Sequence, residues 1–135
     1  MAWRHGFQGV GVASDDSDLL EVTALQHQLR QFADVRDWEQ FHSPKNLAMA
    51  LAGEAGELLE IFQWLSETES RELTDDDRAR VAEEIADLQI YLLRLADVLR
   101  VSLQAAVADK MDQNERKYPV GESKGNATKY SRRGR

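Results

Sequence analysis

The stretch VAEEIADLQIYLLRLADVL, residues 81–99, decides the fold because it carries two interleaved helical patterns. Its apolar residues recur at spacings of four and three, the period of one helix face, at Val81, Ile85, Leu88, Leu92, Leu95 and Leu99. Four polar residues follow a similar period beside that stripe, namely Glu84, Asp87, Tyr91 and Arg94. The sequence therefore predicts a long helix that carries an acidic pair at the border of its core-facing side.

A second acidic pair, Glu54-Ala-Gly-Glu57, lies in an apolar helical run that starts at Ser43-Pro44. Residues three apart on a helix project to the same side, so each pair presents two carboxylates together. Because the connection between the two runs is short, we expect an antiparallel hairpin that brings both pairs to one level. Clustered carboxylates repel one another unless a cation neutralises them, and oxygen ligands suit Mg²⁺, with Mn²⁺ as a second choice. The predicted metal ligands are Glu54, Glu57, Glu84 and Asp87.

The acidic pairs have two alternative interpretations. For a single pair the alternative is a solvated helix surface, and the presence of two pairs favours a metal site. A di-iron bundle would need Glu-x-x-His motifs from two helices, and the only such motif, Glu39 to His42, stands alone before Pro44. The chain has no cysteine, which excludes disulfides and thiolate ligands.

The rest of the chain predicts further helices, and the fold class is all-α. A stripe through Val22 and Phe32 indicates a helix from about Asp18 to Val35, and Ser102 and Pro119 bound the last one. The polar segment 66–77 reads as a loop in which Thr74 caps the next helix. We expect a flexible N-terminal extension at residues 1–18, one helical domain at 19–120 and a flexible basic tail at 121–135.

Charge and hydropathy limit the class of protein. The net charge of −7 divides into +5 for residues 110–135 and −12 for the remainder. An acidic body disfavours nucleic-acid binding, which depends on basic surface. No apolar run reaches membrane length and no signal peptide is recognisable, so we expect a soluble cytoplasmic protein without a membrane partner. The second helix is apolar around nearly its whole circumference, which predicts self-association.

Several other residues are placed to contact a ligand. Trp38 and His42 occupy the polar hinge before the second helix, and Tyr91 lies one turn beyond Asp87. For each aromatic residue the alternative role is ordinary core packing. Three residues share one face of the last helix and would suit phosphate, although a solvated basic stripe is the alternative: Lys110, Asn114 and Lys117.

The whole motif set resembles a known family. A spacer of 26 residues separates the two acidic pairs, and RDWEQFH (36–42), FQW (62–64) and the segment from KMD to KYP (110–119) accompany them. In this combination the chain resembles the MazG-type all-α nucleoside triphosphate pyrophosphatases, and among them the dCTP pyrophosphatase branch. It departs from the eukaryotic dCTP enzymes at Leu29, where they place a histidine nine residues before the tryptophan.

The resemblance implies an antiparallel four-helix bundle, assembled as a dimer or a dimer of dimers. It also implies Mg²⁺-dependent cleavage of a dNTP, most simply dCTP or a modified dCTP, to dNMP and pyrophosphate. The four carboxylates would bind the metal, and Glu57 is our first candidate for orienting or deprotonating the attacking water. The implied base and sugar pocket comprises Trp38, Glu39, Gln40, Phe41, His42, Trp64 and Tyr91, and the phosphate side Lys110, Asn114 and Lys117. The alternatives are the same chemistry on dUTP or another non-standard nucleotide, and a non-catalytic helical interaction module.

Overall fold

The computed structural model describes residues 21–132, and every regular element within that range is a helix. The expected all-α class is thereby confirmed for the described part of the chain. The predicted N-terminal extension, residues 1–18, and the last three residues of the predicted tail lie outside it. Contacts divide the chain into two units, residues 1–100 and 101–135.

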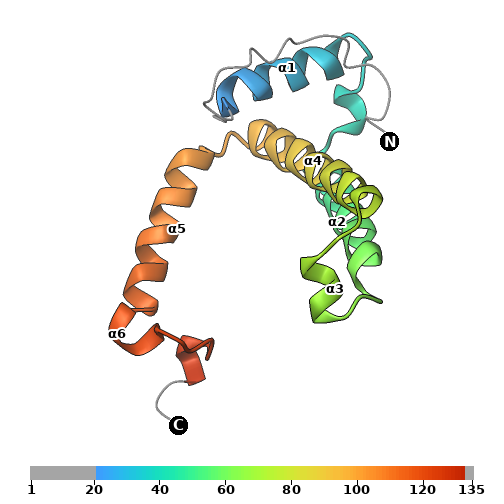
Figure 1. Cartoon of the computed structure of the whole chain (residues 1–135). Coiled ribbons are helices and arrows are strands. Elements are labelled where there is room, and N and C mark those ends of the chain that lie inside the picture. The colour runs from blue at the N-terminus through green and yellow to red at the C-terminus, as the bar shows by residue number, and fades with distance from the viewer. Residues whose placement is uncertain (1–20, 133–135) are drawn as a thin grey trace. The chain divides into compact units, whose positions relative to one another are not determined.

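Helix α4 (Asp75–Val98) is the central element of the first unit (Figure 1). It packs along α2 (Pro44–Phe62) and also contacts α1 (Val22–Asp34). The short 3₁₀ helix η1 (Glu39–Phe41) lies between α1 and α2. Apolar side chains from all three α-helices form the core, namely Leu29, Ala33, Leu47, Ile61, Tyr91, Leu93 and Ala96.

Helices α2 and α4 pair in opposite directions, as the sequence predicts. Glu54 of α2 lies beside Glu84 and Asp87 of α4. One turn earlier on α2, Leu51 lines a groove together with Leu88 and Leu92, which lie further along α4 than Asp87. Partners that advance on one helix as they recede on the other define an antiparallel pair, which brings the acidic segments together.

Capping residues begin the helices where the sequence places them. The Ser43 hydroxyl accepts from the Asn46 N–H at 3.2 Å, with Pro44 in the first turn of α2. Thr74 accepts from the Asp77 N–H at 3.1 Å at the start of α4. Such bonds satisfy N–H groups that a helix leaves open, and each contributes about 1 kcal/mol.

Segment 66–77, predicted as a loop, instead contains the short helix α3 (Glu67–Arg71). Ser66 Oγ accepts from the Glu69 N–H at 3.3 Å, and the Glu69 carboxylate accepts from the Ser66 N–H at 2.8 Å. This reciprocal capping box stabilises a helical turn even in a polar segment. The Ser-x-x-Glu signature was present in the sequence, so the loop prediction was wrong at this point.

The second unit contains α5 (Leu103–Lys117), α6 (Val120–Ser123) and the 3₁₀ helix η2 (Tyr130–Arg132). Ser102 caps α5 as predicted, accepting from the Ala105 N–H at 3.3 Å. Tyr118 and Tyr130 pack edge to face with ring centroids 6.1 Å apart. Among the described helices, none is long and apolar enough to cross a bilayer.

Replacing Leu93 with alanine should lower the free energy of unfolding by about 2–5 kcal/mol, because it leaves a cavity in a packed core. Leu93 is 1% exposed, whereas Leu99, at the C-terminal end of α4, is 51% exposed. Leu99→Ala should therefore cost less than about 1 kcal/mol. Urea denaturation of both variants measures the two losses, and equal losses would contradict the core described above.

Candidate metal centre

Three carboxylates from two helices meet between α2 and α4. One oxygen from each of Glu54, Glu84 and Asp87 lies within 4.8 Å of the others. Glu84 is 7% exposed, and the other two are partly buried. The i,i+3 spacing on α4 aligns two of the groups, and the antiparallel packing supplies the third.

The electrostatics of this cluster favour a bound cation. At about 5 Å and an effective dielectric constant of about 20, each pair of like charges repels by roughly 3 kcal/mol. Oε2 of Glu54 and Oε2 of Glu84 are buried and accept no hydrogen bond from protein, although both residues make other interactions. A set of three carboxylates fits Mg²⁺ or Mn²⁺, which prefer oxygen ligands and retain positions for water and phosphate.

Glu57, the fourth predicted ligand, lies outside the group of three. It is exposed on α2, one turn beyond Glu54. The structure therefore brings together three of the four predicted carboxylates. The assignment of all four to one metal stays a prediction.

The residues predicted to form the base pocket divide by exposure. His42 and Tyr91 are each 2% exposed, and Trp38, partly buried, packs edge to face on His42 with ring centroids 6.0 Å apart. Phe41 is exposed, and Trp64 is 86% exposed. The Phe32 ring centroid lies 5.8 Å from that of Trp38, so Phe32, Trp38 and His42 form an aromatic cluster, while Tyr91 is buried on α4.

Two further polar residues of that predicted pocket have local contacts. The Gln40 amide donates to the carbonyl oxygen of Asp37 at 3.0 Å and to its carboxylate at 2.8 Å. Asp37 has a φ of 54°, a left-handed conformation that is costly for residues other than glycine. The two hydrogen bonds from Gln40 stabilise this turn. Glu39 forms an ion pair with Arg94.

The predicted phosphate residues Lys110, Asn114 and Lys117 lie along α5 in the second unit. The Lys117 ammonium lies 5.3 Å from the centroid of the Tyr130 ring, a cation–π contact within that unit. The role of these three residues at a phosphate stays a prediction.

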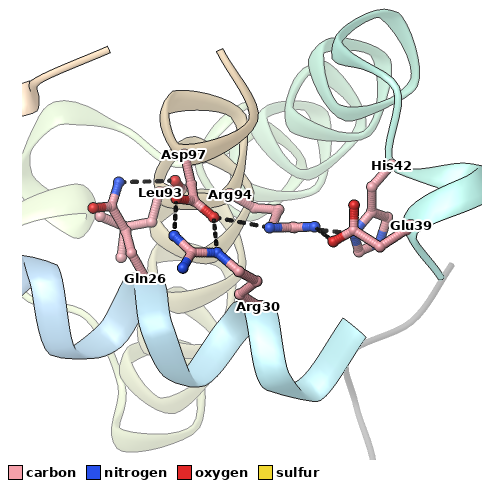
Figure 2. A network of polar contacts seen from close by, with 7 residues as sticks. All are labelled: Gln26, Arg30, Glu39, His42, Leu93, Arg94 and Asp97. Carbon is pink, nitrogen blue, oxygen red and sulfur yellow. Dashed lines mark hydrogen bonds and ion pairs between the residues drawn. The ribbon is translucent and has the colours of Figure 1, made fainter. Parts of the chain in front are cut away.

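A network of charged residues surrounds the buried Arg94 (Figure 2), and the sequence predicted no role for Arg30, Arg94 or Asp97. Arg94 is 2% exposed and donates to His42 Nδ1 at 3.2 Å and to Asp97 at 2.9 Å. Arg30 of α1 donates to the same Asp97 from Nε at 3.1 Å. One sequence feature could have indicated this network. Arg94 continues the polar period of α4 toward the core, and a charge in the core needs partners.

The network shifts the pKa values of three of its members, and that of Arg30 is raised chiefly by its hydrogen bond to Asp97. The hydrogen bond from Arg30 is the main reason that the pKa of Asp97 lies below its ordinary value, and the charges of Arg30 and Arg94 add to it. Burial is the main cause of the lowered pKa of His42, followed by the positive charge of Arg94, while Glu39 acts in the opposite direction. His42 is therefore held as the neutral imidazole.

Comparison with known proteins identifies the family. Residues 50–132, more than half of the chain, match the MazG-like family, and they include all three clustered carboxylates. The chain belongs to the MazG-like family, as the sequence motifs predicted.

Individual relatives narrow the resemblance. The chain is 50% identical to dCTP pyrophosphatase 1 of Mus musculus over 103 residues, which cover 75% of this chain and 61% of the relative. It is 47% identical to dCTP pyrophosphatase 1 of Homo sapiens with the same coverage. The chain thus spans about three fifths of the length of these curated relatives. The crystal structure of a pyrophosphatase from Archaeoglobus fulgidus matches with a TM-score of 0.70 and 45% identity, covering 78% of this chain and 98% of that one.

The burial of neutral His42 predicts a pH-dependent stability. Because its folded pKa lies below the ordinary value of 6.5, the unfolded chain takes up a proton that the folded chain does not. The free energy of unfolding should be constant above about pH 7.5 and fall as the pH is lowered from there to about 5.5.

Urea denaturation at several pH values in this range measures the slope of the free energy of unfolding against pH. His42→Gln should flatten it, whereas His27→Gln, at an exposed position of α1, should leave it as in the wild type. An unchanged slope in the His42 variant would show that another group causes it.

Proposed function

We propose that this chain is a Mg²⁺-dependent nucleoside triphosphate pyrophosphohydrolase. It cleaves the bond between the α and β phosphates of a dNTP, most simply dCTP or a modified dCTP, and releases dNMP and pyrophosphate. The observation that carries the proposal is the cluster of Glu54, Glu84 and Asp87 across two packed helices. The 47–50% identity to dCTP pyrophosphatases over 103 residues supports the choice of substrate.

Each side chain has a role in this proposal. Glu54, Glu84 and Asp87 hold the cation, which when bound offsets phosphate charge and lowers the pKa of water. Glu57 is exposed beside these three carboxylates. It takes a proton from the attacking water while the water oxygen bonds to the α phosphorus and the P–O bond to the departing pyrophosphate breaks. Glu57 thus acts beside the three ligands, and it can also contribute an oxygen to the cation.

The nucleoside end of the substrate would lie against the aromatic cluster. Trp38 offers a ring face or edge for a base, and Tyr91 lies one turn beyond Asp87 on α4, between the carboxylates and Arg94. Phe41, Trp64, Glu39 and Gln40 border this pocket in the proposal. Lys110, Asn114 and Lys117 of α5 would bind phosphate oxygens that the cation leaves charged.

The residue at position 29 supports an alternative substrate. Leu29 is 2% exposed in the core, where the eukaryotic dCTP enzymes place a histidine. A buried leucine has no hydrogen-bonding group for a base, so dUTP or another non-standard nucleotide is the alternative substrate.

We also propose that residues 19–120 form an antiparallel four-helix bundle that assembles as a dimer or a dimer of dimers, with residues 121–135 as a flexible basic tail. Exposed apolar side chains on two helices support the assembly. Met49 and Leu59 of α2 are 63% and 62% exposed, and Ile85 of α4 is 54% exposed. A groove on α2 and α4 is lined by Leu51, Ile85, Leu88, Gln89 and Leu92. A second copy would cover this apolar surface.

The reaction is tested by measuring release of pyrophosphate and monophosphate from dCTP, 5-methyl-dCTP, dUTP and dTTP with Mg²⁺. Glu84→Gln should lower kcat/KM by about 100-fold or more, because even residues behind a metal ligand cost about 10- to 100-fold. Glu83→Gln, the exposed neighbour, is the matched control and should keep wild-type activity. Glu57→Gln should abolish turnover and leave the helical content unchanged.

The four nucleotides distinguish dCTP from the alternative substrates and from a non-catalytic module. Preferential turnover of dUTP would keep the chemistry and reject dCTP as the substrate. If no nucleotide is hydrolysed and Mg²⁺ with nucleotide does not raise the melting temperature, the non-catalytic module is the better description.

The assembly is tested by light scattering after size exclusion. The wild type should elute as a dimer or tetramer, and Met49→Glu with Leu59→Glu should yield a smaller species because charges cannot be buried unpaired in an apolar interface. Glu60→Gln, an exposed polar change on the same helix, should leave the mass unchanged. A monomeric wild type would contradict the proposal.

A further inference from the structure

The proposed chemistry leaves Arg94 without a role, although burying its charge is costly. It is among the largest fully buried side chains, at 2% exposure. It lies seven residues beyond Asp87 on α4, a rise of about 10 Å along the helix. Tyr91 lies between the two on the same side. Arg94 is therefore distant from the carboxylates and close to the aromatic cluster.

The contact between Arg94 and His42 defines the protonation of the imidazole. Nε of Arg94 donates to Nδ1 of His42 at 3.2 Å. A guanidinium has donors only and stays charged, so Nδ1 must be the unprotonated nitrogen. In the neutral ring the hydrogen then resides on Nε2. His42 presents a hydrogen-bond donor at that atom.

The guanidinium that imposes this state is itself fixed on its other sides. Asp97 accepts from Nη1 at 2.9 Å, and Glu39 forms an ion pair with Nη2. Asp97 is in turn bound by Arg30 of α1. Figure 2 shows the chain of contacts running from α1 through α4 to the segment that carries Glu39 and His42. Two acids, and Arg30 through one of them, thus hold the guanidinium that faces His42.

We propose that Arg94 is a positioning residue that keeps His42 in the Nε2–H form, so that His42 donates a hydrogen bond to an acceptor atom of the nucleoside bound beside Trp38. The inference rests on the proposed function, because it assigns the nucleoside end of the same site. It adds a selection rule: a base or sugar atom at this position must be a carbonyl, hydroxyl or ring-nitrogen acceptor. Asp97 and Arg30 act only by orienting Arg94.

The first test needs no nucleotide. The ¹⁵N shifts of the imidazole nitrogens, measured near pH 7.5, distinguish protonated from unprotonated nitrogen, and His42→Gln identifies the resonances. We expect Nε2 protonated and Nδ1 unprotonated in the wild type, and a mixture of both forms in Arg94→Met. Arg80→Met removes an exposed guanidinium from the same helix, outside this network, and should leave the His42 shifts unchanged.

A wild-type His42 with its proton on Nδ1 overturns the proposal, and this measurement does not depend on the stability of any variant. An Arg94→Met protein that folds and keeps the Nε2–H form also overturns it.

The second test separates positioning from a general structural role. Because the contact is remote from the reacting phosphorus, Arg94→Met should raise KM about three- to tenfold and leave kcat near the wild-type value. In a His42→Ala background the same change should have no further effect on KM, since the two residues act as one unit. Equal losses in both backgrounds overturn the proposal.

The two tests distinguish the possible failures. A wild type that hydrolyses no nucleotide overturns the proposed function and, with it, the assignment of His42 to a nucleoside. Wild-type turnover with independent effects of Arg94 and His42 overturns only the present inference.

Discussion

The packing of α2 against α4 is the contact on which the rest of the first unit depends. It brings Glu54 to Glu84 and Asp87, and Leu47 of α2 and Leu93 of α4 are each 1% exposed. Hydrophobic burial favours this packing, whereas repulsion among the three carboxylates opposes it by several kcal/mol. The same contact thus stabilises the fold and creates a place where a divalent cation would be favoured.

Local sequence rules were sufficient for most of the elements. Ser43, Thr74 and Ser102 begin helices because each side chain satisfies an open N–H, and that requirement depends only on neighbouring residues. The apolar period of residues 81–99 likewise defined α4 and the side that carries Glu84. The sequence did not predict helix α3 because its five residues, ETESR, are polar and have no apolar period, and its capping box is the local signal for it.

The site was less predictable because its details depend on contacts between helices. The i,i+3 spacing groups Glu54 with Glu57 on one side of α2, but the path of α4 determines which of them meets Asp87. Two of the three partners of Arg94, His42 and Glu39, lie 52 and 55 positions away, and no periodicity within α4 identifies them. A buried arginine predicts that partners exist, and only the fold supplies their identity.

The position of the three carboxylates on two separate helices has a consequence for chain topology. Glu54 and Glu84 are 30 residues apart in a chain that has no cysteine. An ion shared between them would close that loop and restrict the unfolded ensemble in the way that a disulfide does, with a loop-closure entropy that grows slowly with length. Unlike a covalent bridge, this cross-link would form and dissolve with the free concentration of the ion, without any oxidant or reductant.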